Sequence, residues 1–469
     1  MAIVQDITAE EDQVASSLHE LLASLRTLVK GLDLPVNVFN ETDPFALSQH
    51  DSITFLSIKQ ISTTITEIDE DWGWDDVSPE QQAQLLGPII RLSGDDPWSS
   101  PSIRREIDSI QPHLPKSLPL TLLHSLRPSF APHPSLSSAS RPLPKPTAGS
   151  EGTIDMHDVQ PFKDVSSWGV ANILSWSASR LTQEEIERYL GIVLPPTLVL
   201  MDDYEPRWRE KGISALSSWI FTLPAQTLQN MRLPSLLLPS LIHSLALHPH
   251  PPQPSILPTT LRFLRYTTEA GSEERARWVG EIVEKRLVDG WVYAKDGREG
   301  REVRIGLARE VEVLCGEIGT GIARWTRQLI PNLLNPLQYA PTPLTIPHLS
   351  SNLSALLCLI KTLSPTGLGG RWRGKIMNVM ARQWVLCKER RGVDDGDDVI
   401  VKPIMELIQR IINELNKQFP GDVPRELGVL RLVVKGGQLD GLLLGLGLGP
   451  CLSSSSSSSS TCSPSPSGL

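Results

Sequence analysis

The chain has 469 residues, 40% of them hydrophobic, and a formal net charge of −9. This acidic balance disfavours nucleic acid or an anionic membrane as the main partner, because both carry negative charge themselves. No apolar run reaches the roughly 20 residues that span a bilayer, and the acidic N-terminus lacks the order of a secretory signal. The five cysteines show no CxxC spacing, which suits a reducing compartment. We therefore expect a soluble intracellular protein, cytoplasmic and nuclear.

Residues 1–126 are predicted to form a helical region of degenerate repeats. Thr8 and Glu11 make a capping box for a helix over 8–32, and apolar periodicity indicates a second helix over 51–68. Ser78 followed by Pro79 is a favoured helix start, because serine caps the free N–H groups and proline suits the first helical position. Another helix is predicted over 97–110.

Residues 127–160 are rich in proline and serine. Proline removes helical hydrogen bonds, and such a composition buries too little apolar surface to offset the entropy of ordering. We predict a flexible insertion or linker here.

From residue 161 to 435 the helical pattern is continuous. Turn-like interruptions recur roughly every 40 to 55 residues, the period of HEAT and armadillo units. The fold class predicted is therefore all-α, an α-solenoid of HEAT/armadillo-like helical hairpins. The predicted helices cover 165–179, 183–201, 206–222, 233–248, 255–270, 273–289, 301–318, 320–337, 347–363, 373–391 and 399–418.

The stretch 186–223 shows the repeat most clearly. One apolar stripe ends at Asp202 and Asp203, and Pro206 then opens a second helix, whose stripe includes Gly212. Two amphipathic helices joined by a short turn cannot bury both stripes alone, so they must stack on similar units. The two carboxylates could act as general acid and base, but a turn between helices favours a structural role, with acceptors for free N–H groups and for nearby basic residues. The predicted repeat signature is Pro195, Pro196, Asp202, Asp203, Pro206, Arg209 and Gly212.

The tail, residues 436–469, includes a run of eight serines from Ser453 to Ser460. Such low-complexity sequence has neither periodicity nor side chains to bury, so we predict disorder.

No catalytic, cofactor or metal site is predicted. Residues 369–375, GGRWRGK, satisfy the spacing of a phosphate-binding loop, so an NTPase using Lys375 is a remote alternative. Ile376 stands where magnesium needs a hydroxyl, and no strand is predicted before the motif; an inter-helix loop is favoured. His243, His248 and His250 have proline neighbours and no further ligands at metal spacing.

Tryptophan and arginine are favoured at the energetic centres of protein interfaces. In the C-terminal repeats, 300–435, the candidate partner-binding residues are Trp325, Arg371, Trp372, Arg373 and Trp384. Two further tryptophans, Trp72 and Trp74, lie among acidic residues, and the sequence leaves open whether they dock a partner or fill the first repeats.

The segment PPTLVLMDDYEPRWREKGISAL fits the HEAT pattern: proline in the first helix, aspartate at the turn, then proline and a basic residue. More narrowly, it resembles the signature LPPxLxLxDDYEPxxxxxG of the Tel-two-interacting-protein-two family. The matching residues are Leu194, Pro195, Pro196, Leu198, Leu200, Asp202, Asp203, Tyr204, Glu205, Pro206 and Gly212.

This resemblance implies a non-enzymatic scaffold subunit of the Triple-T complex. Its partners would be the Tel-two protein, a longer HEAT subunit, the ninety-kilodalton heat-shock chaperone machinery and the phosphatidylinositol-kinase-related kinases that the complex helps to mature. The family has no catalytic residues to carry over. A solenoid of this kind could instead serve as an adaptor in nuclear transport or trafficking, and the sequence does not decide between these two functions.

Overall fold

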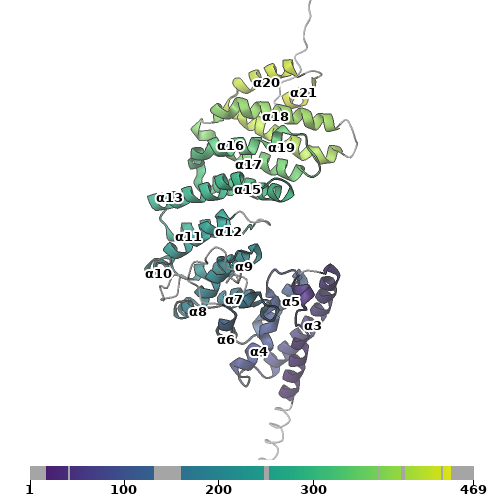
Figure 1. Cartoon of the computed structure of the whole chain (residues 1–469), viewed down its shortest axis with the longest axis vertical. Coiled ribbons are helices and arrows are strands. Elements are labelled where there is room, and N and C mark those ends of the chain that lie inside the picture. Colours follow the sequence, from purple (N-terminus) through teal and green to yellow (C-terminus); the bar gives the residue numbers. More distant parts are fainter. Residues whose placement is uncertain are drawn as a thin grey trace, which may run out of the picture. The chain divides into compact units, whose positions relative to one another are not determined.

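A computed structural model describes residues 17–40, 43–130, 160–247, 253–367, 369–391, 397–434 and 437–444. Every regular element in these ranges is helical, which confirms the predicted all-α class (Figure 1). The chain divides into two compact units, residues 1–282 and 283–469.

In the described part of the first unit, residues 17–30 are helical; residues 8–16 of the helix predicted over 8–32 lie outside the described residues. Several of its helices start at a polar cap followed by proline: Asp43, Ser78 and Ser100 each accept hydrogen bonds from backbone N–H groups of the first turn. The helices are α2 (Val36–Phe39), α3 (Pro44–Asp71), α4 (Pro79–Ile90), α5 (Pro101–Ile110), α6 (Leu118–Ser125), α7 (Val170–Ala178), α8 (Gln183–Met201), α9 (Pro206–Trp219), α10 (Ala225–Asn230), α11 (Leu233–Ala246), α12 (Ile256–Thr267) and α13 (Glu273–Ile282).

Three hairpins, α6/α7, α8/α9 and α11/α12, form the repeating part of this unit. Helices α6, α8 and α11 contact in sequence as one layer, and α7, α9 and α12 as the other. The apolar stripes meet between the layers, where Trp219 and Phe263 are completely buried. This stacking of hairpins is the arrangement that the sequence periodicity predicts.

Residues 127–160 do not separate two domains, contrary to the predicted boundary. Helix α6 lies before this stretch and α7 after it, yet the two pack directly against each other. Arg127–Ser129 form a short 3-10 helix, and Phe130 stacks on buried Phe162. The predicted linker at 131–159 lies outside the described residues.

The second unit has a two-layer pattern of its own. Helices α15, α17 and α19 pack in succession, and α16, α18 and α20 form the neighbouring layer (Figure 1). The elements are a π-helix (Val283–Val288), α14 (Asp289–Tyr293), α15 (Arg298–Ile318), α16 (Thr326–Leu334), α17 (Ile346–Leu363), α18 (Gly369–Arg391), α19 (Asp397–Gln418), α20 (Asp422–Val433) and α21 (Asp440–Leu444).

Part of the predicted disordered tail is folded. Residues 437–444 form a turn and α21, and Leu439, Leu442 and Leu443 are buried. The indole nitrogen of Trp384 donates to the carbonyl oxygen of Gln438 at 3.1 Å. The leucines therefore find a core to join, which the composition of the tail does not reveal. The serine run lies outside the described residues.

Candidate interaction surfaces

The acidic turn between α8 and α9 is a buried structural centre. Asp202 is the exposed C-cap of α8, and Pro206 opens α9. The buried carboxylate of Asp203 lies 2.9 Å from Nζ of Lys163 and accepts a hydrogen bond from the backbone N–H of Glu205 at 2.8 Å. Both oxygens of Asp203 thus have structural partners.

Lys163 also pairs with Glu205 at 2.9 Å. Burial opposes the charge on Glu205, but Lys163 and Arg207 outweigh this effect and hold the pKa of Glu205 below its usual value. The amino group of Lys163 lies 4.2 Å from the ring centre of Tyr204, whose side chain is exposed. The turn is therefore a charged network around one lysine.

Arg209 joins this turn to the following hairpin. Its guanidinium donates to the carbonyl oxygen of Asp203 at 3.3 Å and to the side-chain oxygen of Gln253 at 3.1 Å. Gln253 in turn donates to the carbonyl oxygen of Pro206. Because Gln253 lies just before α12, these bonds link successive repeats.

Lys211 joins the same hairpin to preceding elements. Its Nζ lies 3.0 Å from a carboxylate oxygen of Asp96 and donates to the side-chain oxygen of Asn172 at 3.0 Å. Asn172 also donates to Asp96 at 2.6 Å. The structure thus places the predicted basic residues in contacts between repeats.

Gly212 lies where α9 is in close contact with the backbone of α8. A Cβ atom there would stand 2.5 Å from the backbone nitrogen of Met201 and 2.8 Å from the carbonyl carbon of Leu200. Pro195 and Pro196 are inside α8, which departs from helical geometry at Tyr189 (φ −106°). The signature residues therefore determine the geometry of the α8/α9 hairpin and stabilise it.

Two of the predicted partner-binding residues are not on the surface. Trp325 and Trp384 are 6% and 2% exposed, because both fill the core of the second unit. Trp74 is likewise buried, and its indole donates to the carbonyl oxygen of His113 at 2.8 Å. These large aromatic side chains are buried in the core and do not have the interface role that composition alone predicts.

The segment 369–375 forms the first two turns of α18, so the predicted inter-helix loop is wrong, and the segment does not have the loop geometry that a phosphate-binding motif needs. Arg373 pairs with Asp422 at 2.6 Å and Glu426 at 2.7 Å, which ties α18 to α20 and raises the pKa of Arg373. Arg371 and Lys375 are exposed and Trp372 is half-buried. Partner binding by Arg371 and Trp372 stays a prediction.

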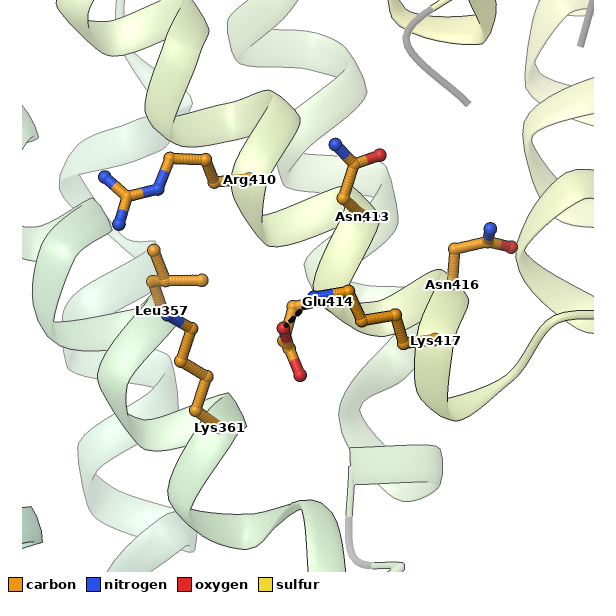
Figure 2. A pocket seen from close by; sticks show the side chains of 7 residues that line it. All are labelled: Leu357, Lys361, Arg410, Asn413, Glu414, Asn416 and Lys417. Carbon is orange, nitrogen blue, oxygen red and sulfur yellow. Dashed lines mark hydrogen bonds and ion pairs between the residues drawn. The ribbon is translucent and has the colours of Figure 1, made fainter. Parts of the chain in front are cut away.

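A groove between α17 and α19 was not predicted. It has a volume of about 420 Å³ and is lined by Leu357, Lys361, Arg410, Asn413, Glu414, Asn416 and Lys417. Figure 2 shows Leu357 and Lys361 extending from α17 and the other residues lying on α19.

The groove is positively charged. Three cations and one carboxylate line it, and Glu414 is already paired with Lys417 at 3.2 Å (Figure 2). Lys361 and Arg410 form no ion pair or hydrogen bond through their side chains with any residue in the described ranges. Two cations in one groove without counter-charges favour a negatively charged ligand.

A signal for this groove exists in the sequence. Arg410, Asn413 and Lys417 follow the i, i+3, i+7 spacing of one helix face within the predicted helix 399–418. Their juxtaposition with Lys361, however, depends on the packing of α17 against α19. Sequence spacing alone does not predict that contact between α17 and α19.

Within the described residues, no group of histidine, cysteine, aspartate and glutamate has metal-site geometry. No described helix has the length and apolar content needed to cross a bilayer. His248 and His250 lie outside the described residues.

Stacked hairpins joined by charged contacts define this chain as a helical-repeat protein. The particular family follows from comparison: the chain belongs to the Tti2 family, whose model matches residues 85–344, more than half of its length. The chain is also similar to mouse TELO2-interacting protein 2, with 28% identity over 74 residues. That similarity spans 15% of this chain and 14% of the mouse protein.

Proposed function

We propose that this chain is a non-enzymatic scaffold subunit of the Triple-T co-chaperone complex. Family membership supports this assignment, and the name of the mouse relative refers to interaction with TELO2. Its action would be to hold the Tel-two protein and a longer HEAT subunit together, in support of the maturation and stability of phosphatidylinositol-kinase-related kinases by the heat-shock chaperone. Such a function places the protein in the cytoplasm and nucleus.

The docking region for the longer HEAT subunit lies in residues 300–435, and its contact surface is the α17/α19 groove. The observation that carries this proposal is the pair of cations, Lys361 and Arg410, that lack counter-charges in the described ranges. Complementary charge on a partner would fix its register and speed its association. Stacked helices supply the rigid frame that such a contact needs.

The test is a co-expression pull-down with the Lys361→Glu/Arg410→Glu variant. Reversing both charges places three acidic groups, with Glu414, where a negatively charged partner surface should lie, so recovery of the longer HEAT subunit is expected to fall at least about tenfold. The matched control is Arg327→Glu/Arg382→Glu, which reverses two exposed cations on α16 and α18. Circular dichroism of both variants checks that the fold is intact.

Equal recovery with the groove variant and the wild type would reject the groove as the docking surface. Mass spectrometry of the purified complexes also addresses the alternative function: transport factors in place of Triple-T subunits and kinases would support an adaptor.

A further inference from the structure

A second cavity in the second unit has the features of a ligand pocket. It has a volume of about 380 Å³ and is lined by residues of α14 to α17, with no residue in common with the α17/α19 groove. Trp291 and Tyr339 provide aromatic surface, and Arg304, Asn332 and His348 provide polar groups. A concave space with aromatic surface and a few convergent polar groups is the usual form of a binding pocket.

The imidazole of His348 is the most informative of these groups. The residue is 8% exposed, and its buried Nε2 atom makes no hydrogen bond with any of the described residues. Burial, together with the positive charges of Arg304 and Arg301, lowers the pKa of His348 to about 4. A buried polar atom without a partner costs about 1 to 3 kcal/mol, so a ligand that completes its hydrogen bonding is favoured.

Arg304 and Asp296 are the charged residues that line this cavity in the described part of the chain, and Arg304 has donors to spare. It donates to the carbonyl oxygen of Ala294 at 2.9 Å and lies 3.6 Å from the carboxylate of Asp296. Asp296 is fully exposed, and ion pairs of that kind are weak. Because a guanidinium carries five N–H donors, an incoming carboxylate can bind Arg304 in place of Asp296.

The loop beside the cavity is already held in place. Arg301 donates to the carbonyl oxygen of Leu344 at 3.1 Å, and Arg390 donates to that of Pro341. Tyr339, at the start of the same loop, is 67% exposed. A preformed wall reduces the entropy lost on binding, and an exposed aromatic ring at the rim can pack against an apolar group.

We propose that this cavity binds an aspartate or glutamate side chain from an acidic peptide segment of a protein partner. Arg304 and the Nε2–H tautomer of His348 hold the carboxylate, while Trp291 and Tyr339 pack against a neighbouring apolar residue of the peptide. This inference rests on the proposed scaffold function only in taking its ligand from a protein partner.

The experiment selects ligands with the full-length protein from a phage-displayed library of random 12-residue peptides. Selected peptides are expected to carry aspartate or glutamate next to an aromatic or aliphatic residue. Their affinity, measured by fluorescence anisotropy, should fall at least about tenfold in Arg304→Gln and in Tyr339→Ala, since each change removes a direct contact. The matched controls, Arg309→Gln on the exposed face of α15 and Tyr293→Ala at a 71% exposed tyrosine, should leave affinity unchanged.

His348→Phe separates binding from folding. The substitution keeps a ring of similar size but removes the unpartnered nitrogen, so peptide affinity should fall about tenfold while the melting temperature stays the same or rises. Selected peptides without acidic residues, or with affinity indifferent to Arg304 and His348, would overturn the proposal. Free glutamate binding as tightly as the peptides would overturn it too, because the cavity would then be a small-molecule site. These results do not depend on the pull-down with the α17/α19 groove variant, so either proposal can fail alone.

Discussion

At the scale of single residues, the distance between α8 and α9 depends on the missing side chain of Gly212. An added Cβ atom would stand 2.5 Å from the backbone nitrogen of Met201, closer than packed atoms tolerate. Gly212→Ala should therefore lower the free energy of unfolding by about 1 to 3 kcal/mol, and Gly212→Leu by more. Urea denaturation measures the change.

The matched control is Gly191→Ala in α8, where an added Cβ would meet no atom within 4 Å. Alanine is the better helix former, so this change should be neutral or stabilise by up to about 1 kcal/mol. A Gly212→Ala protein as stable as the wild type would mean that the two helices are not in close contact at this position.

A second prediction at the scale of single residues concerns the stability contributed by the ion pair of Asp203 and Lys163. The side chains are 2% and 11% exposed, and removing one member of a buried pair leaves the other charge short of a partner. Asp203→Ala should cost about 3 kcal/mol, at the low end of the usual range because Glu205 still pairs with Lys163. The urea midpoint measures the loss.

Asp202→Ala is the control for Asp203→Ala. Asp202 is exposed and accepts a hydrogen bond from the hydroxyl of Ser240 at 2.7 Å, so its substitution should cost about 1 kcal/mol. Equal effects of the two substitutions would contradict the structural distinction between the adjacent carboxylates.

At the scale of elements, several prolines among the described N-terminal residues lie at the first or second position of a helix. Pro101 is the first residue of α5, and Pro119 is the second residue of α6, where a missing N–H costs nothing. The stretch 111–126 contains three prolines, yet it includes α6 with Leu122 and Leu123 buried. The position of each proline in its helix matters more than their number.

Helix α21 allows a direct test of how far the folded chain extends. A protein ending at residue 436 would lose the cover over Trp384, together with the buried leucines Leu439 and Leu442. Each fully buried leucine contributes about 1.5 to 3 kcal/mol, so this protein should have a clearly lower melting temperature than one ending at residue 444. Equal melting temperatures would show that α21 does not pack against α18.

At the scale of the whole molecule, stability in a repeat protein is a sum of contacts between neighbouring repeats. A substitution should therefore loosen its own hairpin and the adjacent ones and leave distant helices protected. Hydrogen exchange followed by mass spectrometry is expected to show faster exchange in α8 and α9 for Gly212→Ala, with α18 and α19 unchanged.

The reciprocal variant is Trp384→Ala, which should speed exchange in α18 and α19 but not in α8 and α9. The two substitutions lie in different compact units, and residues that share no contact rarely couple. A uniform rise in exchange along the whole chain would instead indicate a single cooperative unfolding unit.

Much of the helical pattern is determined by the sequence itself. The α8 boundaries, 183–201, agree with the prediction, because Thr182 with Glu185 forms a capping box and Asp202 ends the helix at a turn. The role of Gly212 could also be predicted, since small residues allow two helices to approach. Local signals of this kind act within a few residues, so a short segment of the chain contains all the information required to predict where a helix begins and ends.

Only the tertiary structure decided which residues meet across repeats. Lys163 forms an ion pair with Asp203, which is 40 residues away in sequence. Trp384 is covered by the residues just before α21. Lys361 and Arg410, on different helices, line the same groove. A tryptophan or a lysine has the same appearance in sequence whether it fills a core or faces solvent. Its environment is set by helix packing, which brings together side chains that no local spacing relates.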